Sequence, residues 1–152
     1  MLKKILNIIE LNNVLDTLKK ENKKIVFTNG CFDILHRGHV EYLQKSRELG
    51  DFLILGLNSD SSVKRLKGND RPINNENDRA AVLSALECID YICIFDEDTP
   101  FELIKALKPD ILAKGGDYKT EDVVGREFSK ETVIIDFVDG YSTTNIIKKI
   151  NG

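Results

Sequence analysis

The only two histidines of this 152-residue chain, His36 and His39, stand three residues apart, soon after a short apolar run at 25–28. If a helix begins by His36, this spacing puts both imidazoles on one face of it. Such a helix N-terminus favours an anion, and imidazole donors can stabilise phosphate oxygens whose charge grows during a reaction. Gly38 lets the backbone approach that phosphate. The stretch predicts phosphate chemistry; a surface helix with two solvated histidines is the alternative.

A basic cluster follows the predicted strand at 52–57, and its members are Lys64, Arg65, Lys67 and Arg71. Glycine, asparagine, aspartate and proline around these side chains indicate a loop at 64–72. Solvation is the usual explanation for such charges, but a triphosphate held by the histidines would need cations nearby. We therefore interpret the cluster as phosphate-binding.

Arg79 is a further candidate cation, in the first half of the next predicted helix. The helix dipole disfavours a cation there, so either exposure or a phosphate partner should account for it.

Two other stretches place small or polar residues after predicted strands. Gly115-Gly116-Asp117-Tyr118 follows the strand at 110–114, and paired glycines allow a ligand close to the backbone, although a tight turn is equally compatible. Gly140-Tyr141 leads into Ser142-Thr143-Thr144 after the strand at 133–138. Ser142 is a good N-cap, and three consecutive hydroxyls are more than a cap requires. A second anion-binding helix N-terminus is the interpretation.

These residues need a scaffold that brings strand ends together. Strands are predicted at 25–28, 52–57, 91–95, 110–114 and 133–138, and helices at 36–49, 74–86, 100–108 and 142–150. Strand–helix–strand units imply parallel pairing with right-handed crossovers, so ligands bind at the carboxyl ends of the strands. The predicted fold is α/β: a Rossmann-like three-layer α/β/α arrangement with a five-stranded parallel sheet.

Two helix starts have specific signals. The run Asn58-Ser59-Asp60 offers caps for a short helix that reaches Val63. Thr99 to Glu102 has the pattern of a capping box with Pro100 at the first helical position. The stretch 120–128 is poorly defined, either a short helix or a loop.

The N-terminal segment 1–24 carries Ile8, Leu11, Leu15 and Leu18 at helical spacing. We expect an amphipathic helix that packs on the same domain as residues 25–152, with a dimer contact as the second interpretation. No segment is long enough to span a membrane.

Composition limits the function classes. Charged residues make up 31% of the chain and the net charge is −3, which gives no overall attraction for nucleic acid or anionic membranes. The three cysteines, Cys31, Cys88 and Cys93, show neither disulfide nor zinc spacing, so we expect a reduced, cytoplasmic setting.

The chain resembles the cytidylyltransferase-like nucleotidyltransferases from Ile25 to Ile150. The resemblance lies in Gly30-Cys31-Phe32-Asp33, His36-Arg37-Gly38-His39 and Gly140-Tyr141-Ser142-Thr143-Thr144. In that family, the last two motifs contact the nucleotide triphosphate. Within it, the runs TNGCFDILHRGHVEYL, VKRLKGNDRPIN, FDEDTP, KGGDY and DGYSTTNIIKKI are similar to the branch that adenylylates heptose 1-phosphate, and Phe137 replaces an arginine usual in the cytidylyltransferases.

This resemblance implies an enzyme that transfers AMP from ATP to a sugar 1-phosphate, giving ADP-heptose for bacterial surface polysaccharide and pyrophosphate. It implies catalytic roles for His36, His39 and Lys67, and contacts of Lys64 and Arg65 with the substrate phosphate. The nucleotide-binding residues it implies are Thr28, Asn29, Gly30, Cys31, Phe32, Gly38, Arg79, Gly115, Gly116, Asp117, Gly140, Tyr141, Ser142, Thr143 and Thr144.

The expected cofactor is Mg²⁺ that arrives with ATP. Asp33 is a candidate ligand, and a loop cap is an equal interpretation of that residue. We also expect a homodimer, and a sugar kinase on a separate protein.

Other functions stay open. A glycerol-3-phosphate cytidylyltransferase would use the same chemistry with CTP, and a non-catalytic nucleotide-binding module would bind ATP without pyrophosphate release. An aminoacyl-tRNA synthetase fragment lacks its K-M-S-K-S run, and a dinucleotide dehydrogenase lacks G-x-G-x-x-G. A histidine metal site has too few suitable ligands.

Overall fold

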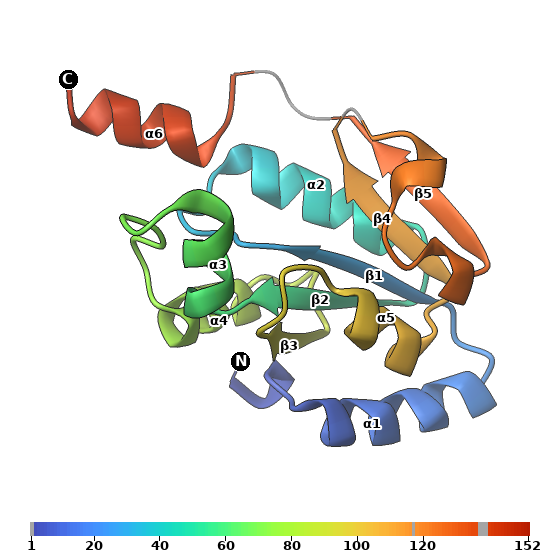
Figure 1. The fold of residues 1–152 in the computed structure, drawn as a ribbon. Helices are drawn as coiled ribbons and strands as arrows, with labels where there is room; N and C mark the ends of the chain where they lie inside the picture. Colours follow the sequence, from blue (N-terminus) through green and yellow to red (C-terminus); the bar gives the residue numbers. More distant parts are fainter. Residues whose placement is uncertain (1, 117, 137–139) are drawn as a thin grey trace.

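The computed structural model describes residues 2–116, 118–136 and 140–152. Its centre is a parallel sheet in the order β3-β2-β1-β4-β5 (Figure 1). The strands are β1 (Ile25–Gly30), β2 (Phe52–Asn58), β3 (Tyr91–Phe95), β4 (Ile111–Gly115) and β5 (Glu131–Ile135). The predicted α/β fold with a five-stranded parallel sheet is confirmed.

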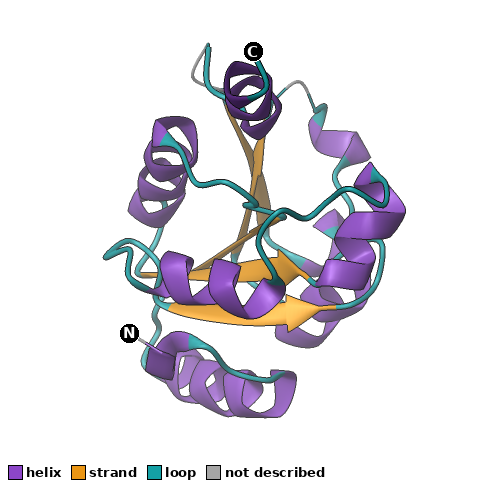
Figure 2. Cartoon of the chain, turned by 90° about the vertical axis from the view of Figure 1, so that its left-hand side faces the viewer, coloured by secondary structure: helices purple, strands orange, loops and turns teal. Residues whose placement is uncertain are grey.

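Helices cover both faces of this sheet (Figure 1, Figure 2). They are α1 (Ile8–Lys20), α2 (Arg37–Glu48), α3 (Asp60–Lys67), α4 (Glu76–Ser84), α5 (Phe101–Leu107) and α6 (Thr143–Ile150), with 3₁₀ turns η1 (Leu2–Lys4), η2 (Thr120–Asp122) and η3 (Arg126–Phe128). Successive residues of β1 point to opposite faces, so Ile25 and Phe27 pack with α1 and α5, whereas Val26 packs with α2 and α4. This alternation produces two hydrophobic layers, one on each side of the sheet.

Some element boundaries differ from the predictions. Strand β1 continues to Gly30 because Asn29 and Gly30 still pair with Gly56 and Leu57 of β2. Strand β5 ends at Ile135 and so is shorter than predicted, and residues 137–139 lie outside the described part of the chain.

The predicted loop at 64–72 is wrong in its first half. Helix α3 runs to Lys67, with Ser59 as its N-cap, and Gly68 ends it with a φ of 105°. The three basic residues of the last turn, Lys64, Arg65 and Lys67, suit the negative end of the helix dipole.

The predicted capping box at Thr99 is also wrong. Pro100 is itself the N-cap of α5, and within the described chain no side chain caps this helix. Its other end agrees with the prediction, because Lys108 adopts a left-handed conformation and Pro109 follows.

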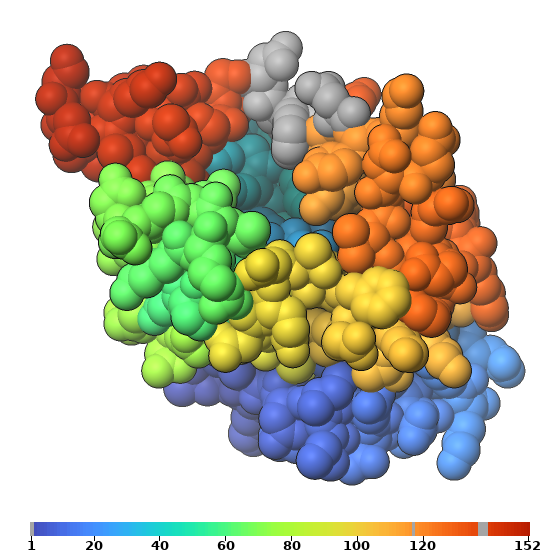
Figure 3. All heavy atoms as spheres, in the orientation of Figure 1, coloured from blue at the N-terminus to red at the C-terminus, as the bar shows by residue number. Residues whose placement is uncertain are grey.

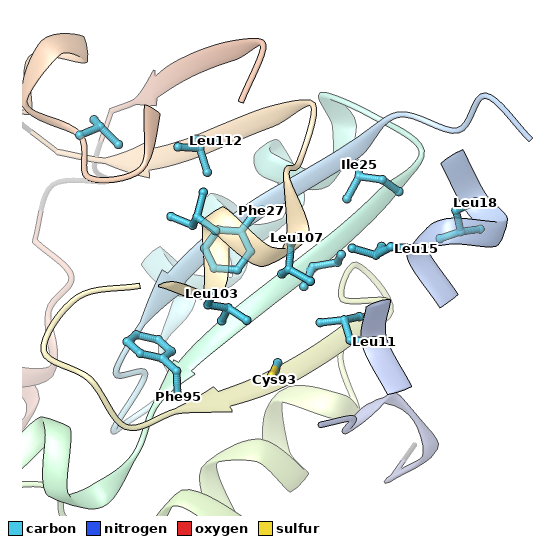
Figure 4. Packing of buried hydrophobic residues seen from close by; sticks show 13 residues of the cluster. Leu11, Leu15, Leu18, Ile25, Phe27, Cys93, Phe95, Leu103, Leu107 and Leu112 are labelled. Carbon is cyan, nitrogen blue, oxygen red and sulfur yellow. The ribbon is translucent and has the colours of Figure 1, made fainter. Parts of the chain in front are cut away.

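The N-terminal helix is part of the domain core. Figure 4 shows Leu11, Leu15 and Leu18 pointing from α1 toward Leu107 of α5 and the strands. All three leucines are buried in the same hydrophobic cluster as α5 and the strands. Across the described residues, we find no helix that is both long enough and apolar enough to cross a membrane.

Truncating Leu15 tests this packing. Leu15 is 1% exposed, so Leu15→Ala should lower the free energy of unfolding by about 2–5 kcal/mol, measured by urea denaturation. Ile9 lies on the same helix but is 71% exposed, so Ile9→Ala is the matched control and should change stability by less than ~0.5 kcal/mol. Equal effects of the two substitutions would contradict the assignment of α1 to the core.

Candidate active site

A cavity of about 810 Å³ opens at the carboxyl ends of the strands. Its wall includes the ends of β1, β2 and β4, the starts of α2 and α6, the end of α3 and the loop after β3. In Figure 3 the β1–α2 region, in blue and teal, forms the floor of a hollow between α3, α6 and the segments after β3 and β4. The sheet order reverses at β1 and β4, which is where open α/β sheets bind ligands.

Most of the residues predicted from the sequence meet in this cavity. The ones that line it are Asn29, Gly30, Cys31, Phe32, Asp33, His36, Gly38, His39, Lys67, Arg71, Gly115, Tyr118, Gly140, Tyr141, Ser142, Thr143 and Thr144. Among the described residues, those predicted but absent from the lining are Thr28, Lys64, Arg65, Arg79 and Gly116. Asp117 lies outside the described residues, as does Phe137.

The two histidines cap helix α2 reciprocally. His36 is the N-cap, and its Nδ1 accepts the backbone N–H of His39, while His39 Nδ1 accepts the backbone N–H of His36, each at 3.4 Å. The rings stack with centroids 3.7 Å apart. Because Nδ1 of each ring is an acceptor, the proton of each neutral imidazole is on Nε2. Both histidines therefore keep one N–H donor for a ligand.

Burial keeps these imidazoles neutral. It lowers the pKa of His39 to about 4, with a smaller contribution from the neighbouring His36, and it lowers the pKa of His36 as well. At neutral pH both residues are uncharged donors. A bound anion would favour the protonated form and raise both pKa values.

Gly38 is required by packing around the histidine ring. A Cβ at this position would lie 2.9 Å from Tyr141 Cβ and 3.0 Å from both Cε1 and Nδ1 of His36. The structure thus gives a reason for the glycine besides the predicted approach of a phosphate. Tyr141 in turn stacks on His36 with ring centroids 6.3 Å apart.

The two helix starts are joined by one hydrogen bond. Thr143 at the beginning of α6 donates from Oγ1 to the carbonyl of Ile34 at 3.3 Å. Ser142 caps α6 by accepting the N–H of Asn145, as predicted. This bond brings the hydroxyl run of α6 to the same cavity as the histidines of α2.

Asp33 secures the loop between α3 and α4. The buried carboxylate accepts the backbone N–H groups of Ile73 and Asn74 and pairs with Arg71 at 3.0 Å. Burial raises the pKa of Asp33, but these three donors outweigh it, so the pKa lies below its ordinary value. Both carboxylate oxygens are engaged, which supports the loop cap over the metal ligand.

Arg79 connects three segments of chain beneath the cavity. It is 2% exposed, and its guanidinium donates to the carbonyls of Asn74, Cys31 and Asn58 and pairs with Asp60 at 2.9 Å. The expectation that exposure or a phosphate explains this arginine is wrong. It is a positioning residue that orders the ends of β1 and β2 by binding their carbonyl oxygens.

Thr28 and Arg65 also lie outside the lining and are engaged with other residues of the chain. The buried Thr28 hydroxyl lies 2.6 Å from the hydroxyl of Tyr42, a residue that does line the cavity. Arg65 pairs with Asp98 at 2.7 Å and also donates to the carbonyl of Asp96. Of the predicted cluster, Lys67 and Arg71 are the members that reach the lining.

The family follows from comparison with known proteins. The sequence pattern described as cytidylyltransferase-like matches residues 27–149. The chain belongs to the cytidylyltransferase-like family. It is 60% identical over 143 residues to "Bifunctional protein HldE" of Helicobacter pylori (strain G27), and 62% identical over 141 residues to the protein of that name from a Nitratiruptor species. These matches cover 94% and 93% of this chain but 31% and 30% of the relatives, so the chain spans less than a third of their length.

Solved structures agree with this family. A lipopolysaccharide core biosynthesis protein from Thermoplasma volcanium GSS1 superposes with a TM-score of 0.66 at 32% identity, covering 77% of this chain and 99% of that one. Pantoate-beta-alanine ligase from Francisella tularensis has a TM-score of 0.62 at 13% identity, covering 97% of this chain and 76% of that one, and shares the fold alone. The family membership makes the chain a nucleotidyltransferase enzyme.

Several lining residues of this cytidylyltransferase-like chain were missed by sequence reasoning. They are Tyr42, Asn58, Asp98, Thr99, Lys114 and Asp122, among others. The sequence did contain a signal for Lys114. It is a lysine one residue before the carboxyl end of an otherwise apolar strand, and ligands bind at the carboxyl ends of parallel strands.

Within residues 2–116, 118–136 and 140–152, no three His, Cys, Asp or Glu side chains are grouped as metal ligands.

The histidine pair of this cytidylyltransferase-like site can be tested by titration. The folded pKa of His39, about 4, lies below the unfolded value near 6.5, so its contribution to stability is complete above pH 6.5 and is lost as pH falls toward 4. NMR of the imidazole carbon-bound protons should show His39 still neutral at pH 6, whereas the urea-unfolded chain titrates near ~6.5. A folded His39 pKa of 6.5 or higher would contradict the described environment.

Proposed function

We propose that this chain transfers AMP from ATP to a sugar 1-phosphate, with D-glycero-beta-D-manno-heptose 1-phosphate as the substrate, and releases pyrophosphate. The observation that carries the proposal is the shared cavity, into which two helix N-termini bring two imidazoles and three hydroxyls. Such an array of neutral donors suits a multiply charged phosphate chain. The heptose assignment rests on the similarity to the adenylylating branch of the family, and the likeness to a 32% identical lipopolysaccharide core biosynthesis protein supports it.

The reaction needs positioning more than proton transfer. An oxygen of the sugar phosphate attacks the α-phosphorus of ATP in line, one P–O bond forms, and the bond to the β-phosphate breaks with pyrophosphate leaving. The nucleophile is already ionised, so no general base is required. Catalysis then consists of holding the two phosphates together and stabilising the charge that develops on them.

We assign the stabilising donors to the residues of the cavity. The Nε2–H groups of His36 and His39 bind oxygens at the reacting phosphate, and Lys67 neutralises the leaving pyrophosphate. The hydroxyls of Ser142 and Thr144 and the N–H groups at the start of α6 bind the rest of the triphosphate, while the Thr143 hydroxyl holds α6 to the carbonyl of Ile34. Lys64 and Arg65 lie outside the lining, so they are not assigned to the substrate phosphate.

Magnesium belongs to the substrate in this proposal. Mg²⁺ usually keeps several waters and is held by substrate phosphates with one or two carboxylates. We propose that it enters with ATP. We further propose a cytoplasmic homodimer, and a sugar kinase activity that precedes this step in the supply of the sugar 1-phosphate.

The proposal is tested by measuring pyrophosphate release with four nucleoside triphosphates and several acceptors. ATP with heptose 1-phosphate should give the highest kcat/KM. The cytidylyltransferase alternative, favoured by the family description, predicts a preference for CTP with glycerol 3-phosphate. Binding of ATP without pyrophosphate formation with any sugar phosphate would identify a nucleotide-binding module instead.

Removing either imidazole should slow the reaction. His36→Ala and His39→Ala should each lower kcat by about 10²-fold or more, corresponding to ~3 kcal/mol of transition-state stabilisation. Circular dichroism checks that α2 persists, since His36 also caps it. Lys45 is exposed further along the same helix, so Lys45→Ala is the control with wild-type turnover. Wild-type rates in both histidine variants would exclude the assigned roles.

A further inference from the structure

Lys114 is a basic residue of the cavity that the proposed function has not used. It lies on β4, beside the point where the sheet order reverses, and its side chain is half-buried in the cavity wall. Its Nζ lies 4.7 Å from the centroid of the Tyr118 ring. A lysine in this position has given up part of its hydration.

Lys114 differs from the other basic residues of the cavity wall in its ion-pair partners and its exposure. Arg71 pairs with Asp33, and Asp98 pairs with Arg65. Among the described residues, no carboxylate lies in ion-pair distance of Lys114 or of Lys67. Asp122 is the one other acidic residue of the described lining, and it is exposed. Lys67 is exposed and Arg71 is paired, so Lys114 is the partly buried cation of the described wall that has no carboxylate partner among the described residues.

A partly desolvated ammonium is costly to the folded chain without an acceptor. Burial lowers the pKa of Lys114, and the nearby Cys31 thiol opposes this only in part. The Tyr118 ring offers a cation–π contact, which stabilises the charge without accepting its hydrogen bonds. The ammonium group has three donors, and phosphate offers several oxygen acceptors in a cavity whose histidines and hydroxyls we propose to bind phosphate.

We propose that Lys114 is a phosphate-binding residue of this site, held toward the ligand by the ring of Tyr118. The inference rests on the proposed function, because the phosphate comes from one of its two substrates. That phosphate belongs either to the nucleotide or to the acceptor sugar phosphate. Both sources have the same chemistry, and separate affinity measurements distinguish them.

The experiment compares Lys114→Met with Lys114→Arg and with Lys119→Met, a control at an exposed lysine outside the described lining. Calorimetry measures Kd for α,β-methylene-ATP and for heptose 1-phosphate. Lys114→Met should raise the Kd of one of the two ligands by 10-fold or more, and the ligand affected shows which substrate supplies the phosphate. The Kd values of Lys114→Arg should stay within a few-fold of wild type. Lys119→Met should match wild type.

Thermal unfolding of the ligand-free protein separates binding from a structural role. Methionine has nearly the length of lysine and no charge to desolvate, so Lys114→Met should unfold at the wild-type temperature or above. A lower Tm together with weaker binding would assign Lys114 to the scaffold and overturn the proposal. Wild-type affinity of Lys114→Met for both ligands would overturn it as well.

Binding measurements on the same variants distinguish a failure of this inference from a failure of the proposed function. If the wild-type protein binds neither α,β-methylene-ATP nor heptose 1-phosphate, the proposed function fails. The affinity of wild type and of Lys114→Met for inorganic pyrophosphate then decides the role of Lys114. Weaker pyrophosphate binding by the variant supports the inference, and equal binding or no binding by either protein rejects it.

Discussion

The reciprocal capping of α2 is the interaction on which this site depends. Each histidine uses Nδ1 to accept the backbone N–H of the other, so the first turn of the helix and the orientation of both rings are set together. Gly38 makes the arrangement sterically possible, because any side chain there would meet the His36 ring and Tyr141. The consequence is chemical as well as structural: two neutral imidazoles keep Nε2–H donors at a place where the helix already favours an anion.

Behind the histidines, buried charges fix the loops rather than bind substrate. Arg79 binds three backbone carbonyls, including those of Cys31 and Asn58 at the ends of two neighbouring strands. Where Arg79 donates to carbonyls, Asp33 accepts backbone N–H groups, from Ile73 and Asn74 in the loop before α4. Since buried charges are tolerated when they are paired and hydrogen-bonded, both residues hold irregular backbone in place at the floor of the cavity.

The fold and the shared cavity were predictable because strand, helix and parallel pairing follow from local patterns, and parallel strands all end at one edge. The exceptions have physical reasons. Lys64 and Arg65 belong to a helix that the turn-forming residues Gly68 to Pro72 after it concealed. Arg79 binds carbonyls from segments distant in the sequence, which no local pattern reveals. Thr28 has a hydroxyl partner in Tyr42, a pairing that only the packing of α2 on β1 creates. Lys114 was overlooked because the strand around it reads as apolar core.

Helix α6 has an unusual position for an element whose first residues line the cavity. None of its own described residues is buried, and it stands at the margin of the domain in Figure 1, yet Thr143 at its first turn is hydrogen-bonded to Ile34 next to the histidine pair. Its far end exposes Ile150 to solvent. Since none of its described residues belongs to either hydrophobic layer, the place of α6 beside the cavity depends on polar contacts at its first turn, such as the bond from Thr143 to Ile34.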